Sequence, residues 1–388
     1  MPELTLEDLD FDLPPECIAR YPSPERSDAR LLVCERALPQ SPGVIDAPTP
    51  PANASATPCI SRIRNLPPLF TRPALWVFNE SRVMPARLIA TRSSGGQVEI
   101  LLASPLSPAA SERRWTALIR GISRLKPGER LGLAGAEEAI VFVGRDVSSP
   151  GQGIVELPAS RLSVMDWLER FGTVPLPPYL ERSPEPADIE RYQTVYASEP
   201  GSVAAPTAGL HFTPQVLSEL KDHGHQLEFL TLHVGPGTFK PLGDLGSAHT
   251  ISSDRLHLER FCIGAGLAAA VAAARSEGRP IIAVGTTTLR ALESAWVGTR
   301  SAGALSEGPG ETALFVKPGY AFKVVDGLLT NFHLPRTSLI ALVMAHLGVA
   351  ATRRAYALAI EHGFRFYSYG DAMLSVPAGL VHRPEARA

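Results

Sequence analysis

The sequence has few cysteines, no long apolar run and almost no net charge. Its four cysteines, Cys17, Cys34, Cys59 and Cys262, form no CxxC pair, so neither a disulfide framework nor a thiolate zinc site is indicated, and we interpret them as packing residues. No stretch approaches the roughly 18 apolar residues that span a bilayer. The N-terminal MPELTLEDLDFD also lacks the basic start and apolar stretch of a signal peptide. We therefore expect a cytoplasmic protein that binds no membrane.

Two glycine-rich nucleotide motifs are also missing. The chain contains neither GxGxxG nor GxxxxGK[ST] in a strand-to-helix turn, so a dinucleotide site or a P-loop triphosphate site is not supported. No metal need be invoked either. The 388 residues, of which 45% are hydrophobic, are enough for a large core and for two domains, or for one domain with an insertion.

The formal net charge of −2 hides an uneven distribution. Residues 60–130 hold twelve Arg or Lys and four Asp or Glu, which gives this segment a charge of +8 and leaves −10 for the rest. Such a segment is a candidate phosphate-facing surface. It is equally typical of a solvated arginine-rich face that binds nothing, and charge alone does not decide between the two.

The order of sequence patterns predicts an α/β protein with an inserted barrel. Residues 37–73 are rich in Pro, Ala, Ser and Thr, which predicts a surface loop. From residue 74 to 157 short β-type runs such as ALWVF, ARLIAT and QVEILLA recur between turn signals, which is typical of a small antiparallel barrel. After residue 163, helical stretches alternate with strands. FDLPPECIARYP near the start also looks helical and enclosed, so we assign it to the same α/β domain as the C-terminal part. We therefore predict a large mixed, barrel-like α/β domain of residues 1–80 and 160–388. A small antiparallel β-barrel of residues 81–159 would be inserted in it.

Two segments place histidines next to small residues. In GSVAAPTAGLHFTPQVL (201–217), His211 lies just before a helix with Thr213 as its N-cap and Pro214 as its first residue. In FLTLHVGPGTFKP (229–241), strand alternation puts Thr231 and His233 on the face opposite the core. A structural histidine is the plain alternative in each case. Polar groups at a strand end commonly form a ligand crevice, and this favours a site.

Three further segments carry polar groups at expected strand ends. PIIAVGTTTLRALESAW (280–296) predicts a strand, a glycine and then a helix whose first turn is rich in threonine, and ordinary threonine capping is its alternative reading. LLTNFHLPRTSL (328–339) presents Asn331 and His333 before a helix starting near Thr337. FRFYSYGDAML (364–374) predicts an aromatic strand that ends at Tyr369 and Asp371.

These segments together resemble a known family, the S-adenosylmethionine:tRNA ribosyltransferase-isomerases of queuosine biosynthesis. The matching stretches follow one another through nearly the whole chain and are FDLPPECIARYP, RSDARLLV, VFNESRVMPARL, PLPPYLER, ERYQTVYASEPGSVAAPTAGLHFT, TLHVGPGTF, VGTTTLRALES, TNFHLP and RFYSYGDAM. The departures are local: the Pro-rich insertion, Thr-Ser at 337 and 338 in place of Ser-Thr, and extra residues before RLHLE at 255–259.

The resemblance implies a reaction and its partners. The ribosyl group of S-adenosylmethionine would be transferred and isomerised onto the aminomethyl group of 7-aminomethyl-7-deazaguanine, the wobble base of a tRNA with a GUN anticodon. The products would be epoxyqueuosine, adenine and methionine. The cosubstrate would be S-adenosylmethionine without a metal, and we expect a monomer with no obligatory protein partner.

This chemistry needs groups that move protons and groups that hold the cosubstrate. We expect His211 or His233 to act as base or acid and Glu259 or Asp371 to orient the ribose hydroxyls or the sulfonium. Phe332 or Tyr369 would stack on a base or face the cation. The expected substrate-binding residues are Thr207, Thr231, His257, Gly285, Thr286, Thr287, Arg290, Asn331, His333 and Tyr369. The expected tRNA-binding residues are Arg82, Arg87, Arg113, Arg114, Arg120 and Arg124.

Two other functions remain open at the level of sequence. A methyltransferase would use the same cosubstrate, but the chain shows no glycine-rich first turn followed by an acidic strand end. A tRNA-binding module without chemistry would leave the His and Thr segments purely structural. The reaction products separate these alternatives.

Overall fold

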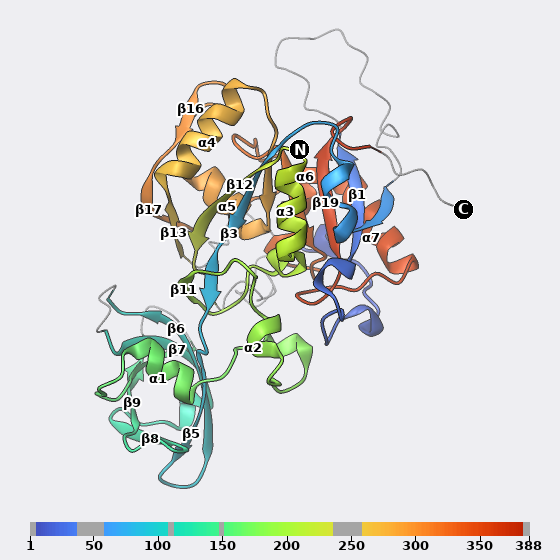
Figure 1. Ribbon diagram of the computed structural model, residues 1–388. Coiled ribbons are helices and arrows are strands. Elements are labelled where there is room, and N and C mark those ends of the chain that lie inside the picture. Colours follow the sequence, from blue (N-terminus) through green and yellow to red (C-terminus); the bar gives the residue numbers. More distant parts are fainter. Residues whose placement is uncertain (1–4, 37–57, 108–111, 147–150, 236–257, 383–388) are drawn as a thin grey trace.

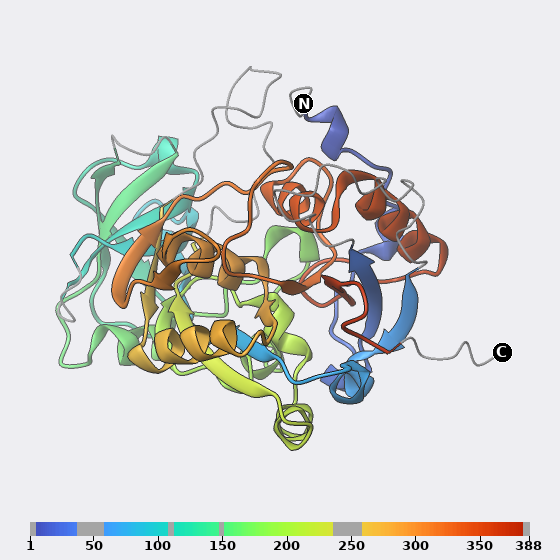
Figure 2. The same cartoon turned by 90° about the horizontal axis from the view of Figure 1, so that it is seen from above.

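The computed structural model describes residues 5–36, 58–107, 112–146, 151–235 and 258–382. Within these ranges the chain forms a nine-stranded mixed sheet flanked by helices and a closed six-stranded barrel. Both Figure 1 and Figure 2 show the barrel at one side of the larger unit.

The large sheet is mixed: its central strands are parallel, antiparallel pairs follow on both sides, and β1 pairs in parallel with β19. Strands β12, β3, β14 and β18 run parallel to one another, and β19 returns antiparallel to β18. The strand order is β17 (Gly308–Thr312), β13 (Glu259–Ile263), β12 (Gln226–Leu232), β3 (Leu75–Asn79), β14 (Ile281–Val284), β18 (Gly327–Asn331), β19 (Ala372–Pro377), β1 (Arg30–Arg36) and β2 (Cys59–Arg62).

Both faces of this sheet are covered, which explains why its central strands are apolar throughout. Along β3, Leu75 and Val77 join the core formed with α4 and α5, whereas Trp76 and Phe78 join the core formed with α3. The cap of α3 is Thr213, whose hydroxyl accepts a hydrogen bond from the backbone of Val216. The helices of this unit are α2 (Asp188–Arg191), α3 (Pro214–Asp222), α4 (Ala265–Ser276), α5 (Thr286–Ala295), α6 (Ser338–Leu347) and α7 (Val349–Glu361).

The barrel closes through antiparallel pairs in the order β10, β7, β6, β5, β8, β9. Its residues alternate inward and outward, as on β5, where Leu88 and Ala90 are buried and Ile89 between them is exposed. Helix α1 (Val164–Phe171) packs its apolar side on the barrel core. The barrel strands are β5 (Arg87–Arg92), β6 (Gln97–Pro105), β7 (Arg114–Arg120), β8 (Glu129–Leu133), β9 (Ile140–Arg145) and β10 (Gln152–Glu156).

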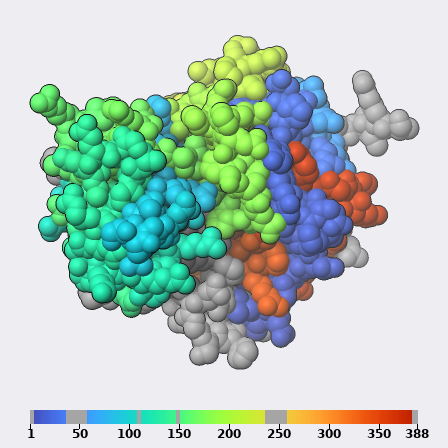
Figure 3. Space-filling model, turned by 90° about the horizontal axis from the view of Figure 1, so that it is seen from below, coloured from blue at the N-terminus to red at the C-terminus, as the bar shows by residue number. Residues whose placement is uncertain are grey.

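Short elements connect these parts. Strand β4 (Ser81–Val83), which precedes the barrel, pairs with β11 (Glu199–Ser202), which follows it. Segments from the two ends of the chain lie together, since β1 pairs with β19, and Figure 3 shows blue and red segments side by side. The remaining elements are β15 (Trp296–Gly298), β16 (Gly303–Leu305) and the 3-10 helices η1 (Glu7–Leu9), η2 (Pro15–Cys17), η3 (Arg26–Asp28), η4 (Ile63–Asn65), η5 (Pro67–Leu69), η6 (Ile122–Arg124), η7 (Pro178–Leu180) and η8 (Thr207–His211).

The expected α/β class, with a mixed sheet and an added small antiparallel barrel, is confirmed. The large domain was expected to be barrel-like. Within the described ranges, however, only the six-stranded sheet closes into a barrel, and the nine-stranded sheet is open. The predicted domain boundaries, 1–80 with 160–388 and 81–159, remain predictions. None of the helices in the described ranges is long and apolar enough to cross a membrane.

Four local expectations were wrong. The run ALWVF forms β3 of the large sheet instead of a barrel strand, because its hydrogen-bonded neighbours are β12 and β14. Within the expected loop 37–73, residues 37–57 lie outside the described ranges, but Cys59–Arg62 forms β2 and Leu66, Leu69 and Phe70 are buried. The segment expected as an aromatic strand turns at residues 367–370, and β19 begins at Ala372. FDLPPECIARYP contains one 3-10 turn, since its prolines limit helix formation.

The expectation that the cysteines are packing residues is met by two of them. Cys17 and Cys34 are buried in the apolar core around α6 and α7. Cys262 is exposed, so it does not serve as a core residue.

Candidate active site

The predicted polar segments meet at one edge of the large sheet. The parallel strands β12, β14 and β18 end there at Leu232, Val284 and Asn331, and β19 begins beside the end of β18, because Asn331 pairs with Ala372. The carboxyl ends of parallel strands are where α/β sheets bind ligands. Three of the segments chosen from the sequence therefore converge for a topological reason.

A pocket of about 650 Å³, counted with its open mouth, lies at this edge. It brings together six residues predicted to bind substrate, namely Thr207, Gly285, Thr286, Thr287, Asn331 and His333. The other lining residues are Tyr179, Ala205, Pro206, Ala208, Val234, Thr330, Leu334, Thr337, Leu339, Tyr367 and Ser368. The pocket is mainly apolar with a few convergent polar groups, as small-molecule sites usually are.

One wall of the pocket is the start of α5. Gly285 has a φ of +97°, a conformation that disfavours any side chain, and it turns the chain from β14 into the helix. The next residues, Thr286 and Thr287, line the pocket, whereas Thr288 turns inward and its hydroxyl donates to the Val284 carbonyl at 2.7 Å. The first backbone N–H groups of a helix attract an anion, so this wall suits a carboxylate.

A second wall comes from the end of β18. The Asn331 amide donates to the backbone carbonyls of Tyr367 and Ser368, at 2.8 and 3.4 Å, and this fixes its orientation. Its Oδ1 atom is buried and has no donor at normal hydrogen-bond geometry among the described residues, although the side chain interacts with the His211 imidazole. The ring of His333 makes a 2.9 Å hydrogen bond with Thr330 through Nε2, and burial lowers the pKa of His333 to about 3. Both side chains are therefore neutral and rigidly held.

His211 lies at the end of η8 and is only 4% exposed. Burial lowers the pKa of its imidazole to about 4, while Asp371 and the Asn331 side chain act in the opposite direction. Its Nε2 atom is buried without a hydrogen-bond partner among the described residues. Although His211 does not line the pocket, its neighbours Thr207 and Ala208 do. The imidazole is neutral at neutral pH.

Two tyrosines form an aromatic wall that the sequence analysis did not single out. The rings of Tyr179 and Tyr367 lie with their centroids 4.1 Å apart, and the hydroxyl of Tyr179 contacts that of Ser368. Tyr367 has a φ of +73°, which is unusual for a residue with a side chain and is a kind of strain that clusters at functional sites. The quoted segments PLPPYLER and RFYSYGDAM contained these residues, but nothing in the sequence distinguished Tyr367 from Tyr369.

The predicted carboxylates are both buried and paired with arginine. Asp371 forms an ion pair with Arg30, and Glu259 forms one with Arg290, whose Nε also donates to the Leu314 carbonyl. Neither pair lines the pocket. Their catalytic or binding roles stay predictions, and their contacts indicate that these carboxylates hold elements in place.

The remaining predicted site residues lie around the pocket. His233 is half-buried against Gly201, and its backbone N–H donates to the Arg260 carbonyl; burial and Arg260 lower its pKa. Thr231 lies within β12 opposite Cys262. The Tyr369 hydroxyl donates to Asp188 at 2.7 Å, away from the pocket. His257 lies outside the described residues.

Phe332, expected to stack on a base, is fully buried in an aromatic cluster with Tyr356 and Phe364. This packing leaves no face of the ring open to a ligand. Among the residues that the structure describes, no group of three His, Cys, Asp or Glu could hold a metal ion.

The six predicted tRNA-binding arginines differ in whether their side chains are bound to other protein groups. Arg113 donates to the carbonyls of Pro158, Ser160 and Leu162, so it holds the chain that leaves the barrel. Arg120 and Arg124, in contrast, are exposed at the end of β7 and in η6. Ion pairs join the other three to carboxylates: Arg82 to Glu169, Arg87 to Glu99 and Arg114 to Glu156.

Comparison with known proteins agrees with this arrangement of motifs. The family model described as "Queuosine biosynthesis protein" matches residues 6–375. An S-adenosylmethionine:tRNA ribosyltransferase-isomerase of Thermus thermophilus is 45% identical over 372 residues, covering 95% of this chain and 99% of the relative. That of Aromatoleum aromaticum is 44% identical over 387 residues and covers 99% of both chains.

One solved structure is also similar to this chain. The S-adenosylmethionine tRNA ribosyltransferase of Thermotoga maritima is 29% identical, with a TM-score of 0.49 over 95% of this chain and 100% of that chain. Since the family model and the full-length relatives agree, the chain belongs to the queuosine biosynthesis protein family, the family of the S-adenosylmethionine:tRNA ribosyltransferase-isomerases.

Proposed function

We propose that this enzyme transfers and isomerises the ribosyl part of S-adenosylmethionine onto the aminomethyl group of 7-aminomethyl-7-deazaguanine at the tRNA wobble position. The products are epoxyqueuosine in tRNA, adenine and methionine. The observation that carries the proposal is the single pocket in which four separate family segments meet, from residues 205–208, 285–287, 330–334 and 367–368. Full-length relatives named for this activity support it.

The pocket has suitable groups for the different parts of S-adenosylmethionine. The α5 N-terminus with Thr286 and Thr287 suits the methionine carboxylate, because the N–H groups and hydroxyls there donate hydrogen bonds to an oxyanion. The tilted rings of Tyr179 and Tyr367 offer a face for a purine or for the sulfonium cation. Asn331 Oδ1, buried beside the His211 imidazole, can accept a hydrogen bond from an N–H or O–H of a substrate.

Proton transfer is the second requirement. The sulfonium acidifies the ribose C5′ hydrogens, so a base removes one of them, and adenine departs as it gains a proton. The neutral amine attacks the ribosyl group and loses a proton, and the C–S bond breaks so that methionine leaves as a neutral thioether. His211, with a pKa of about 4, is unprotonated at neutral pH and therefore fits the base rather than the acid. His233 remains the second candidate, and its lowered pKa favours the same role.

The tRNA partner fits the barrel surface. Exposed Arg120 and Arg124 belong to the segment with the excess of basic residues, and phosphate contacts of this kind orient a nucleic acid without reading its sequence. We infer that the barrel presents arginines to the tRNA backbone while the wobble base enters the pocket.

Product analysis tests this function against its alternatives. Purified protein, S-adenosylmethionine and tRNA with the aminomethyl-deazaguanine base are incubated, and the small molecules are separated by chromatography. Release of adenine and methionine is expected. Release of S-adenosylhomocysteine would instead identify a methyltransferase, and tRNA binding without turnover would identify a binding module. A Thr287→Val variant should raise KM for S-adenosylmethionine, with Thr213→Ser as a matched control outside the pocket.

A further inference from the structure

A second cavity lies at the opposite edge of the large sheet. It is found where β14 and β18 begin and β19 ends, whereas the candidate active site lies where β14 and β18 end. Its volume is about 640 Å³, counted with its open mouth. The lining residues are Arg72, Arg275, Gly278, Arg279, Pro280, Asp326, Pro377, Ala378, Gly379 and Leu380.

The charge of this cavity is positive. Three arginines line it, against the single carboxylate of Asp326. That carboxylate is already engaged, since one oxygen accepts the Ile281 N–H at 2.9 Å and the other contacts Arg300 and lies 3.7 Å from Arg275. Two further carboxylates contact residues of the lining: Glu277 pairs with Arg279, and Glu35 accepts a hydrogen bond from the Gly379 N–H at 2.7 Å. With Arg36 and Arg300, which contact Asp326, five arginines lie at or beside the cavity against the three carboxylates of Asp326, Glu277 and Glu35, so the positive charge is in excess.

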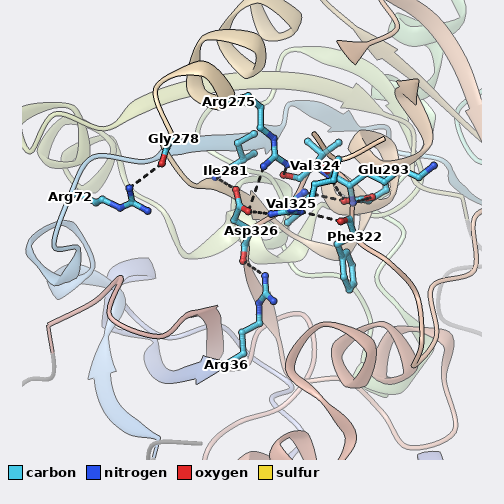
Figure 4. Close-up of polar contacts among 12 residues, drawn as sticks. Arg36, Arg72, Arg275, Gly278, Ile281, Glu293, Phe322, Val324, Val325 and Asp326 are labelled. Atoms are coloured by element: carbon cyan, nitrogen blue, oxygen red, sulfur yellow. Dashed lines mark hydrogen bonds and ion pairs between the residues drawn. The ribbon is translucent and has the colours of Figure 1, made fainter. Parts of the chain in front are cut away.

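Each of the three guanidinium groups also donates to an acceptor of the protein. Arg72 donates to the Gly278 carbonyl at 3.0 Å, Arg279 to the Gln226 side chain at 3.1 Å and Arg275 to the Lys323 carbonyl at 2.7 Å. Figure 4 shows Arg36 and Arg275 directed at Asp326 and Arg72 directed at Gly278, each from a separate segment. An anion would meet donors that folding has already positioned, so less side-chain freedom is lost on binding.

Some donors of this cluster are still unused. The Nε atoms of Arg36 and Arg275 are buried and have no acceptor among the described residues. A buried donor without an acceptor costs free energy, and in native proteins it calls for a ligand, water or ion. Arg36 lies next to the cavity, because its Nη2 donates to the Asp326 carbonyl at 2.9 Å.

We propose that this cavity is a binding site for a phosphoryl group, separate from the candidate active site, with Arg72, Arg275 and Arg279 as its ligands. Three arginines line one cavity, and the planar guanidinium fork binds phosphate oxygens in pairs, so several such groups together suit a phosphoryl group with its three oxygens. The phosphoryl group belongs either to the tRNA backbone or to a free phosphorylated molecule. The site does not depend on the proposed ribosyl transfer.

A purely structural role of the arginines is the competing explanation. Arg275 donates to the carbonyls of Lys323 and Val324, and so it does fasten that loop. Arg72 is exposed and the Arg279 side chain is 21% exposed, so these two residues can be changed while Arg275 and Arg36 keep the loop in place. Substitutions of Arg72 and Arg279 therefore test anion binding without removing the contacts that hold the loop.

Binding of inorganic pyrophosphate to the whole protein, measured by isothermal titration calorimetry at low salt, tests the proposal. R72Q/R279Q should weaken binding at least tenfold, since two charge-assisted contacts are lost. R353Q/R354Q removes the same charge from α7, where both arginines are exposed, and should change the Kd less than twofold. Absent binding by the unchanged protein, or equal weakening in both variants, would overturn the proposal.

A measurement on the unchanged protein covers the case in which R72Q/R279Q does not fold. Phenylglyoxal modifies accessible arginines, and peptide mass spectrometry identifies the sites. Pyrophosphate should slow the modification of Arg72 and Arg279 at least fivefold while leaving Arg354 unaffected. Equal modification with and without pyrophosphate would contradict the site.

The source of the phosphoryl group is decided by tRNA binding in the same variants. If the tRNA backbone occupies the site, R72Q/R279Q weakens tRNA binding and lowers the slope of log affinity against log salt by about 1 to 2. If a free phosphorylated molecule occupies it, tRNA affinity stays within twofold while pyrophosphate binding is lost. Each result supports the phosphoryl site and names its ligand source.

Discussion

Arg30 and Asp371 join the first strand of the large sheet to the segment that forms a wall of the pocket. The Asp371 carboxylate accepts hydrogen bonds from the Arg30 backbone N–H at 2.8 Å, from its Nε at 3.1 Å and from its Nη2 at 2.8 Å. It also accepts one from the Arg365 backbone at 2.8 Å. This set of donors holds the turn that presents Tyr367 and Ser368 to the pocket.

Asp371→Asn should destabilise the protein, because it leaves the partly buried Arg30 guanidinium without its counter-charge. We expect the free energy of unfolding to fall by about 3 kcal/mol. Urea denaturation measures this change. As a control, Glu181→Gln breaks the exposed Arg20–Glu181 pair and should cost less than about 1 kcal/mol. Equal losses in the two variants would refute a structural role for Asp371.

Buried neutral histidines should make the protein sensitive to acid. The pKa of His333 is about 3 in the folded state, below the ordinary value of 6.5, so the unfolded chain takes up this proton first as the pH falls. The stabilisation is complete above about pH 6.5 and is lost progressively as the pH falls towards the folded value. Between pH 7 and pH 5 this one residue should cost about 2 kcal/mol.

Urea unfolding of His333→Gln at pH 7 and pH 5 checks this prediction. The variant should lose about 2 kcal/mol less stability than the unchanged protein over that interval. His223→Gln, at an exposed position, should keep the original dependence. A His333→Gln protein with the original pH dependence would show that the imidazole is not buried in its neutral form.

His211→Gln should lower kcat about 100-fold or more if His211 is the base. Because its pKa is about 4, the unchanged enzyme should show no loss of kcat from this group between pH 8 and pH 6. Single-turnover rates across this range provide the measurement, and His233→Gln distinguishes the second candidate. An acid limb near pH 6.5 that disappears in His211→Gln would contradict the assignment of a buried, neutral base.

The exposed barrel arginines should govern tRNA affinity. R120Q/R124Q should weaken tRNA binding and reduce its salt slope by about 1 to 2, because up to two phosphate contacts are lost. Fluorescence anisotropy with labelled tRNA at several salt concentrations measures both quantities. Arg113→Gln should mainly reduce barrel stability, since Arg113 holds three backbone carbonyls. Unchanged tRNA affinity in R120Q/R124Q would place the tRNA on another surface.

Much of the fold and site could be predicted because the relevant signals are local. An apolar run followed by glycine and threonines marks the end of a buried strand, and this signal does not depend on which strands pair with it. The carboxyl ends of parallel strands then lie at the same edge of the sheet. This is why Gly285, Thr286, Thr287, Asn331 and His333, predicted to bind substrate, come together at one pocket. The Thr213 cap and the helix start near Thr337 could be predicted for the same reason.

Long-range pairing and side-chain partners could not be predicted. The run ALWVF reads equally well as a barrel strand, and only its pairing with β12, about 150 residues later, puts it in the large sheet. Tyr367 and Tyr369 are two residues apart in an aromatic stretch, and the left-handed backbone at Tyr367 decides which one faces the pocket. The ion pairs that occupy Asp371 and Glu259 depend on arginines far away in the sequence.

The measurement that tests the central claim most directly follows the ribose carbons. The protein is incubated with S-adenosylmethionine whose five ribose carbons are ¹³C and with tRNA that carries the aminomethyl-deazaguanine base, and the digested nucleosides are analysed by mass spectrometry. Our account predicts an epoxyqueuosine that contains all five labelled carbons, formed together with unlabelled adenine and methionine. A wobble nucleoside without the label, produced by folded protein on competent tRNA, would contradict ribosyl transfer.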